Sequence, residues 1–270
     1  MNISFIGGGN MASALIGGLV AQGFDASGIR VVDVSLETRE ALLAHHPVRT
    51  YAAIDAEAVD SSVIVLAVKP QQLREVAASL APLLHQQLVI SIAAGVRAED
   101  LSRWLGGYRQ LVRSMPNTPA MVSAGMSGLY ALPEVAQAQR KQAETVLQAV
   151  GATLWLDDES RMDGVTAVSG SGPAYVFYFM EAMQAAATEL GFSTQEARTL
   201  TLQTFLGAAK LASQSEEDAA LLRARVTSKG GTTERALSFM EDEAVKTSIV
   251  QAIHAAAGRS RELGDALGKE

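Results

Sequence analysis

Residues 226 to 237 are rich in glycine and hydroxyl side chains and lead into a helical pattern. Gly230 and Gly231 allow the backbone to approach a ligand closely, and the start of the following helix offers unpaired N–H groups to an anion. Four hydroxyl side chains lie in the same stretch: Thr227, Ser228, Thr232 and Thr233. This stretch therefore predicts a binding site for a small anion such as a carboxylate.

A second group of glycines directly follows an apolar run near the N-terminus. The residues are Ile6, Gly7, Gly8, Gly9, Asn10, Met11 and Ala12, in a G-x-G-x-x-A arrangement. Between a strand and a helix, Gly7 allows a tight turn, Gly9 lets a pyrophosphate approach the backbone, and Ala12 lets the helix pack closely on the strand. The pattern predicts a dinucleotide-binding turn; the alternative is an ordinary glycine turn.

Asp33 ends the next apolar run, 24 residues after Gly9. An acidic residue at this place can bind the 2′-hydroxyl of the adenosine ribose and repels a 2′-phosphate, so by itself it favours NAD over NADP. Ser35 and Arg39 lie just beyond it and can accommodate that phosphate instead. The alternative for Asp33 is a solvated charge at a strand end, and the cofactor preference stays open.

Two further apolar runs end in small residues that can lie beside a dinucleotide. Ala67, Val68, Lys69 and Pro70 follow the first run, and Ala93, Ala94 and Gly95 follow the second. Carboxyl ends of strands at the switch point of a parallel sheet are where such cofactors bind, although residues 93 to 95 can also be a plain turn. Lys69 can meet a phosphate or a ribose. Further on, Asn117 and Thr118 stand between two prolines and either face the nicotinamide amide or only shape their loop.

A parallel α/β sheet would bring these residues together, and the first 157 residues predict one. Strand patterns cover residues 3 to 6, 30 to 34, 63 to 68, 88 to 92, 110 to 113, 127 to 131 and 152 to 156. Helical spacing covers residues 11 to 22, 36 to 44, 71 to 84, 98 to 105 and about 133 to 150. After Asp157 the strand patterns stop, and apolar residues recur every three or four positions. We predict a Rossmann-like dinucleotide-binding domain over residues 1–158 and an all-α domain over residues 159–270.

The composition limits the class of partner. A net charge of −7 and a pI near 5.2 argue against a nucleic-acid or anionic membrane surface, which leaves a small solute as the expected ligand. The longest run without a charged residue, 76 to 96, contains a proline and several polar residues and is not expected to span a membrane. The chain has no cysteine and no signal-peptide pattern, so we expect a cytoplasmic protein without disulfides or thiolate metal sites.

Histidine chemistry is not expected either. His45, His46, His85 and His254 lie outside every motif, and each is interpreted as a surface residue. This disfavours a dehydrogenase with a histidine base and a Ser/His/Asp hydrolase. No metal site is predicted.

Six motifs occur together in one order along the chain. They are the glycine cluster at 7 to 12, AVKP at 67 to 70, AAG at 93 to 95, RSMPNTP at 113 to 119, SGSGPAY at 169 to 175 and SKGGTT at 228 to 233. This combination closely resembles the Δ1-pyrroline-5-carboxylate reductase family, over residues 3 to about 257. The last two motifs are specific to that resemblance.

The resemblance implies NADPH- or NADH-dependent reduction of L-1-pyrroline-5-carboxylate to L-proline, the last step of proline biosynthesis. It also implies a helical domain that interlocks with that of a second subunit, giving a homodimer or a homo-oligomer built on dimers. The substrate pocket would be lined by Ser228, Gly230, Gly231, Thr232 and Thr233, with the hydroxyl of Thr233 reaching the ring nitrogen. Many relatives carry proline where this chain has Lys229, so the loop is expected to be less rigid and more positive.

The chemistry of these residues agrees with that reaction. Reduction of a cyclic imine needs a hydride donor, a fixed carboxylate and a proton on nitrogen, so the protein contributes mainly positioning and electrostatics. Backbone N–H groups of residues 230 to 233 can bind the carboxylate without an arginine. Thr233 can hydrogen-bond the nitrogen, and the proton donor stays unassigned.

Two alternatives remain. A related two-domain dehydrogenase acting on a β-hydroxy acid or another imine usually needs a lysine or other acid/base group on the first interdomain helix, and residues 163 to 175 contain no lysine. A non-catalytic nucleotide sensor has no need of a second, carboxylate-binding site.

Overall fold

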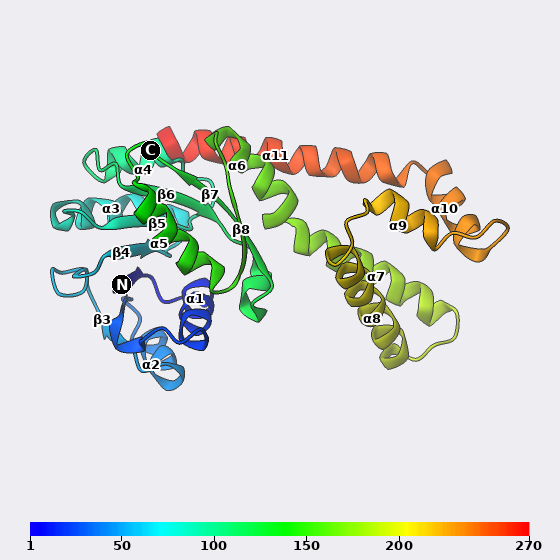
Figure 1. Cartoon of the computed structure of the whole chain (residues 1–270), viewed down its shortest axis with the longest axis horizontal. Helices are drawn as coiled ribbons and strands as arrows, with labels where there is room; N and C mark the ends of the chain where they lie inside the picture. Colours follow the sequence, from blue (N-terminus) through cyan, green and yellow to red (C-terminus); the bar gives the residue numbers. More distant parts are fainter. Residues whose placement is uncertain (270) are drawn as a thin grey trace. The chain divides into compact units, whose positions relative to one another are not determined.

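The computed structural model describes residues 1–269, and its first compact part is built on one eight-stranded sheet (Figure 1). The strand order is β3-β2-β1-β4-β5-β6-β7-β8. The strands are β1 (Ile3–Ile6), β2 (Ile29–Val32), β3 (Arg49–Tyr51), β4 (Val63–Leu66), β5 (Leu88–Ser91), β6 (Leu111–Met115), β7 (Gly125–Ala131) and β8 (Gly151–Trp155). All neighbours are parallel except β6 and β7. The predicted Rossmann-like α/β class is confirmed.

The central strands form the core because most of their residues are apolar; Ser4, Arg30 and Ser91 are the polar exceptions. Each residue of β1, β2, β4 and β5 is buried, which is typical of a parallel sheet covered by helices on both faces. The covering helices are α1 (Asn10–Ala21), α2 (Leu36–His45), α3 (Leu73–Leu80), α4 (Ala98–Trp104) and α5 (Gln137–Gln148). Phe5, Leu15 and Ile64 are fully buried, and each such side chain contributes about 1.5–3 kcal/mol to folding.

The local predictions hold for most elements and fail at two. The seven predicted strands agree with the structure to within two residues at each end. Strand β3 was not predicted, because three residues are too few to show an alternating pattern and Arg49 and Thr50 are polar. The predicted helix at 71 to 84 is wrong as a single element: α3 has 3₁₀ turns on either side, at Pro70–Gln72 and Ala81–Leu83. Pro82 has no N–H to continue the helix.

Strand β7 reverses the direction of the sheet for a simple geometric reason. Only nine residues, 116 to 124, connect β6 to β7. A parallel return needs a crossover of about a dozen residues or more, so the short connection allows only antiparallel pairing. Helix α5 then provides the crossover that makes β8 parallel to β7.

The chain packs as two compact units. The first contains Met1–Pro173 and the C-terminal segment from Ala256 onward, and the second is Ala174–Ala255. After β8 the described chain contains only helices and turns: α6 (Met162–Val165), a π-helical turn (Thr166–Gly170), α7 (Gly172–Glu189), α8 (Thr194–Ser213), α9 (Ala219–Arg225), α10 (Thr232–Asp242) and α11 (Val245–Lys269). The domain limit at residue 158, which follows from the end of the strand patterns, stays a prediction.

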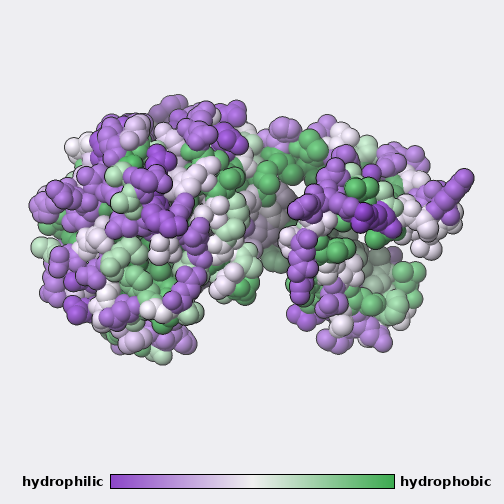
Figure 2. Space-filling view, in the orientation of Figure 1, coloured by the Kyte–Doolittle hydropathy of each residue, from purple (hydrophilic) through white to green (hydrophobic). Residues whose placement is uncertain are grey.

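The second unit buries little of its apolar surface by itself. In α8 only Ala197 and Thr201 are buried, whereas Leu200 and Leu211 are 50% and 57% exposed. Figure 2 shows hydrophobic residues on the surface of these helices. Among residues 1–269, no helix combines the length and the apolar character that a membrane crossing requires.

Candidate functional site

The register of the sheet aligns the carboxyl ends of four parallel strands with the middle of a fifth. Val32, Ile6, Leu66, Ser91 and Arg113 are paired in one row across β2, β1, β4, β5 and β6. The residues that follow β2, β1, β4 and β5 therefore emerge at the same edge of the sheet, and β6 continues two residues further, to Met115. Strands β2 and β4 lie on opposite sides of β1, so the end of β1 is the switch point at which dinucleotides bind in such sheets.

The glycine turn after β1 is shaped partly by its neighbours and partly left open. Gly7 has a φ of +101°, and a Cβ added there would lie 2.7 Å from the backbone oxygen of Ala67. A Cβ added to Gly9 would meet no atom within 4 Å. Gly7 is therefore required by the fold, whereas the space above Gly9 is free for a ligand.

Helix α1 begins beside that space with free backbone donors. Gly9 is its N-cap, and the first helical hydrogen bond runs from the N–H of Ser13 to the oxygen of Gly9 at 2.9 Å. The N–H groups of Asn10, Met11 and Ala12 precede that bond and have no acceptor within residues 1–269. Free donors at the positive end of a helix dipole fit a phosphate.

Asp33 holds the glycine turn together. Its Oδ2 accepts a hydrogen bond from the N–H of Gly8 at 2.8 Å, and its Oδ1 accepts one from the N–H of Ser35 at 2.9 Å. Arg39 donates from Nη1 to the backbone oxygen of Asp33 at 2.6 Å. Asp33, Ser35 and Arg39 thus lie together beside the turn, and ribose or phosphate binding by them stays a prediction.

The two loops expected along the cofactor follow β4 and β5. The first continues the ladder, since the N–H of Ala67 bonds to the oxygen of Ile6 at 2.8 Å, and its Lys69 is exposed just before Pro70 begins a 3₁₀ turn. In the second loop Ala93 and Gly95 are buried and Ala94 between them is exposed. Ala94 is thus the part of this loop that a ligand can reach.

Both polar atoms of the Asn117 side chain form hydrogen bonds with other residues of the protein. Its Nδ2 donates to the backbone oxygen of Ser169 at 3.1 Å and to the hydroxyl of Ser169 at 3.2 Å, and its Oδ1 accepts from the N–H of Met126 at 2.9 Å. Asn117 therefore ties the loop after β6 to the SGSG segment. This favours the loop-shaping alternative for its side chain, and a contact with nicotinamide stays a prediction.

The turn before α10 has the backbone conformation that its glycines suggest. Gly230 has a φ of +75°, and the N–H of Gly231 bonds to the oxygen of Ser228 at 3.0 Å. The N–H of Gly230 bonds to Oε2 of Glu234 at 2.6 Å, a contact that the sequence did not predict. Glu234 therefore holds the loop and also places a negative charge in the first turn of α10.

Three backbone donors at the start of α10 remain available. The first helical bond runs from the N–H of Arg235 to the oxygen of Gly231 at 3.2 Å. The N–H groups of Thr232, Thr233 and Glu234 have no acceptor in the described part of the chain, and Gly231 caps the helix without a side chain. With the half-buried Thr233 hydroxyl, these donors can bind one carboxylate and one further polar atom.

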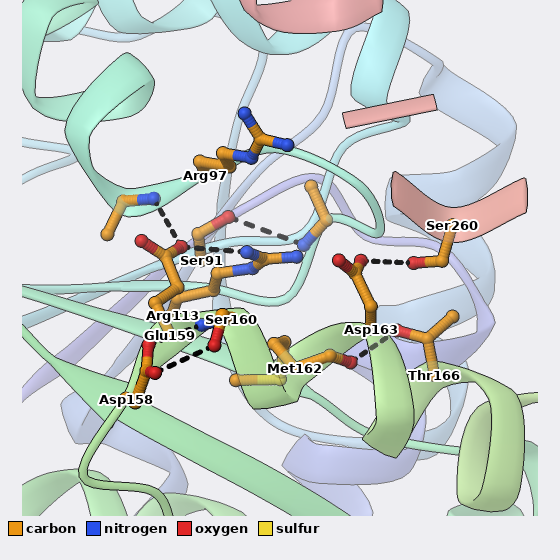
Figure 3. Close-up of polar contacts among 12 residues, drawn as sticks. Ser91, Arg97, Arg113, Asp158, Glu159, Ser160, Met162, Asp163, Thr166 and Ser260 are labelled. Atoms are coloured by element: carbon orange, nitrogen blue, oxygen red, sulfur yellow. Dashed lines mark hydrogen bonds and ion pairs between the residues drawn. The ribbon is translucent and has the colours of Figure 1, made fainter. Parts of the chain in front are cut away.

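Sequence reasoning missed one polar cluster next to this sheet edge (Figure 3). Nη1 of Arg113 lies 2.7 Å from Oε1 of Glu159, and the two side chains are 6% and 18% exposed. The same oxygen accepts a hydrogen bond from the N–H of Ala98 at 2.7 Å. Burial and, next, the Glu159 carboxylate raise the pKa of Tyr130. The signal in the sequence was Arg113 itself, a charge within an apolar strand that needs a partner.

The two sites offer anion binding and positioning. Within residues 1–269, no three His, Asp or Glu side chains lie close enough together to hold a metal ion. The edge of the sheet has free backbone N–H groups at the start of α1 and an open space that fits a diphosphate. The turn before α10 offers the same kind of donors for a smaller anion.

Known proteins match the whole of this chain. A pyrroline-5-carboxylate reductase of Pseudomonas aeruginosa is 50% identical over 269 residues, which is 99% of this chain and 98% of that protein. The chain belongs to the pyrroline-5-carboxylate reductase family. The sequence profile for pyrroline-5-carboxylate reductase dimerisation matches residues 159–263 of this family member, and a profile described as NADP oxidoreductase, coenzyme F420-dependent, matches residues 2–95.

Solved structures of the pyrroline-5-carboxylate reductase family agree. The enzyme of Coxiella burnetii is 42% identical, with a TM-score of 0.92 over 97% of this chain and 98% of its own. A Plasmodium falciparum pyrroline carboxylate reductase with NADP bound is 27% identical, with a TM-score of 0.87 over 98% of both chains. A prephenate dehydrogenase at 14% identity and a TM-score of 0.56 shares the fold alone. The resemblance found in the six motifs is confirmed.

Proposed function

We propose that this protein reduces L-1-pyrroline-5-carboxylate to L-proline with hydride from a nicotinamide cofactor, the last step of proline biosynthesis. The observation that carries this proposal is the 50% identity to a pyrroline-5-carboxylate reductase along nearly the whole length of both chains. The residues described above suit the reaction because their free N–H groups would bind and orient two anionic molecules. The chain's own part is thus positioning and electrostatics.

The cofactor site that we propose is the edge of the sheet at β1. The free N–H groups of residues 10 to 12 would bind the pyrophosphate over Gly9, where no atom of the protein would contact an added Cβ. Asp33 would lie at the adenosine ribose, and the loops at 67 to 70 and 93 to 95 would pass beside the other half. The bound cofactor supplies the hydride.

The substrate site that we propose is the turn before α10. The N–H groups of Thr232, Thr233 and Glu234 would bind the substrate carboxylate, and the glycines at 230 and 231 keep the approach open. The hydroxyl of Thr233 would hydrogen-bond the ring nitrogen as it becomes an amine. Ser228 would line the same pocket. No proton donor is assigned.

We propose NADPH as the preferred cofactor, with NADH as a weaker one. Both oxygens of Asp33 already accept backbone hydrogen bonds, and the Arg39 guanidinium is held at the same place. A guanidinium and the Ser35 hydroxyl are suitable partners for a 2′-phosphate. The NADP bound to the Plasmodium relative and the NADP oxidoreductase profile support this choice.

We propose that a second copy of the chain covers the apolar helices of the second unit. Phe177, Tyr178 and Leu206 are 57%, 71% and 63% exposed in the single chain. Exposed apolar area on this scale marks an interaction surface, and the dimerisation profile covers the same helices. The homodimer, or an oligomer built on it, would give the second unit the core that it lacks by itself.

The direct test is turnover. Purified protein is mixed with pyrroline-5-carboxylate and either NADPH or NADH, and the loss of nicotinamide absorbance is followed together with proline formation. We expect proline in stoichiometric amounts and a higher kcat/KM for NADPH. No turnover with either cofactor, in protein that binds NADPH, would refute the proposed reaction; a preference for NADH would refute only the choice of cofactor.

A further inference from the structure

We propose that Glu159 is a positioning residue that fixes the β5–α4 loop, residues 92 to 97, beneath the nicotinamide half of the cofactor. This inference rests on the proposed function, because that function gives the loop its ligand. Glu159 belongs to the acidic turn at residues 157 to 160, far along the chain from the loop, and nothing in the six motifs assigns it a role. Its contacts give it one.

One carboxylate oxygen joins two structural elements. Oε1 of Glu159 lies 2.7 Å from Nη1 of Arg113, on β6, and 2.7 Å from the N–H of Ala98, the first residue of α4. Arg97, the N-cap of α4, makes no side-chain cap of its own. Glu159 therefore replaces the missing cap from a position 61 residues away and connects it to the sheet.

The contact is shielded from water, so it constrains strongly. Only 6% of the Arg113 side chain and 18% of the Glu159 side chain are exposed. A hydrogen bond between charged groups in such surroundings is stronger and more directional than the same bond in water. Arg113 is fixed in turn by β6, where it pairs with Ser91 of β5 and Tyr130 of β7.

The other contacts of the loop leave one residue facing outward. The N–H of Ala93 donates to the hydroxyl of Ser91 at 3.3 Å, which holds the upstream end (Figure 3). Behind the loop, a Cβ added to Gly95 would lie 3.2 Å from the side chain of Leu267 in α11. Glu159 holds the downstream end, so Ala94 stays at the surface as the exposed residue of a fixed loop.

The order of the strands shows which part of the cofactor this loop meets. Asp33 follows β2 at the expected adenosine ribose, and the pyrophosphate turn follows β1. A dinucleotide that starts at β2 and crosses β1 continues past β4 to β5. The loop after β5 is therefore expected to contact the nicotinamide half and not the adenosine half.

The test compares binding of the whole cofactor with binding of its adenosine half. The probes are NADPH and 2′,5′-ADP, with dissociation constants measured by calorimetry on the full chain, wild type and Glu159→Ala. We expect Glu159→Ala to bind NADPH about tenfold or more weakly, the scale of a lost hydrogen bond to a charged group, and 2′,5′-ADP as the wild type does. Glu159→Gln keeps the acceptor oxygen and is expected to recover most of the NADPH affinity.

Glu144→Ala is the matched control for a general loss of stability. Glu144 is also a partly buried carboxylate with two partners, the indole N–H of Trp155 at 2.7 Å and the ammonium of Lys141 at 3.0 Å, but it lies on α5. Glu144→Ala is expected to lower Tm and to leave the affinities for NADPH and 2′,5′-ADP unchanged. Unchanged NADPH affinity in Glu159→Ala, or equal losses for NADPH and 2′,5′-ADP, would overturn this inference alone. Failure of the wild type to bind NADPH would overturn the proposed function with it.

Discussion

Two glycines of the β1 turn are expected to respond to alanine in opposite ways. Gly7 has a φ of +101°, and its Cβ would lie 2.7 Å from the backbone oxygen of Ala67. Gly9 has a φ of −67°, and its Cβ would contact no protein atom within 4 Å. Gly7→Ala therefore acts on the folded structure, and Gly9→Ala acts on the bound cofactor.

The loss of unfolding free energy in Gly7→Ala follows from the φ of Gly7 and from the distance between its added Cβ and the oxygen of Ala67. A non-glycine residue in a sparsely populated φ region costs about 1–3 kcal/mol, and overpacking against a fixed neighbour adds about 1–3 kcal/mol. The sum, about 2–6 kcal/mol, is a large part of a total unfolding free energy of roughly 5–15 kcal/mol. For a chain of this length it corresponds to a decrease in Tm of about 10 °C.

Gly9→Ala is expected to change the stability of the free protein by less than about 1 kcal/mol. Alanine is a poorer N-cap than glycine, but it also lowers the entropy of the unfolded chain, and the two effects oppose each other. In the complex the new methyl group occupies the open space over the α1 donors and separates the pyrophosphate from them. Loss of one hydrogen bond to a charged group, about 1.5–3 kcal/mol, weakens NADPH binding roughly 10- to 100-fold.

Differential scanning calorimetry with and without NADPH measures both effects. We expect the Tm of the wild type to rise on adding NADPH, because a ligand that binds only the folded state stabilises it. We expect Gly9→Ala to match the wild-type Tm without ligand and to gain much less with it, and Gly7→Ala to have a low Tm in both conditions. A full NADPH-induced gain in Gly9→Ala would refute the position of the pyrophosphate. A wild-type Tm in Gly7→Ala would refute the steric role of Ala67.

Three further substitutions test other parts of the two proposed sites, and a fourth tests the stability of the fold. Thr233→Ala removes the hydroxyl that we propose bonds to the substrate nitrogen. It is expected to lower kcat/KM for pyrroline-5-carboxylate about 10- to 100-fold and to leave the NADPH dissociation constant unchanged. Equal losses in kcat/KM and in NADPH affinity would show that the turn is not the substrate site. Asp33→Asn removes a negative charge, whose repulsion of a 2′-phosphate at the proposed ribose site is about 1 kcal/mol. It is expected to raise the NADPH/NADH ratio of kcat/KM about fivefold. An unchanged ratio would place Asp33 away from the ribose. Glu234→Gln keeps an acceptor for Gly230 and removes a negative charge from the first turn of α10, so KM for the substrate is expected to fall two- to fivefold at low ionic strength; an unchanged KM would mean that the carboxylate binds elsewhere. Burial raises the pKa of Tyr108 from 10.0 to about 12. Its neutral hydroxyl therefore stabilises the fold below pH 10, and that contribution is lost as the pH rises from 10 to 12. Tyr108→Phe is expected to flatten the pH dependence of chemical unfolding over that window, and parallel curves for the two proteins would contradict this.

Local patterns predicted most of the elements, and the failures have local causes. The buried strands β1, β4 and β5 can be recognised in the sequence because every residue in them is apolar or small. The edge strand β3 does not, since its three residues are held by pairing with β2 and not by their own pattern. The helix predicted at 71 to 84 fails because Pro82 interrupts the backbone hydrogen bonding that its apolar spacing suggests.

The candidate sites divide in the same way. The glycines of both turns and the hydroxyl groups of the turn before α10 could be found from the sequence, because a tight turn before a helix is a local feature. The partners of those residues could not. Asp33 bonds to Gly8 across 25 residues, and Asn117 bonds to Ser169 across 52. Sequence reasoning left the Asn117 side chain open between cofactor and loop, and its three hydrogen bonds favour the loop.

By itself, the sequence determined the α/β class, the two glycine-containing turns that precede helices, and the family. These depend on hydrophobic period, on glycine at fixed offsets and on motifs in a fixed order, all of which are written along the chain. Only the tertiary structure decided that Oε1 of Glu159 accepts hydrogen bonds both from Arg113, 46 residues away, and from the N–H of Ala98. That contact exists because the sheet places β6 beside β5 and the acidic turn returns to their carboxyl edge, and no local pattern encodes which distant segments meet.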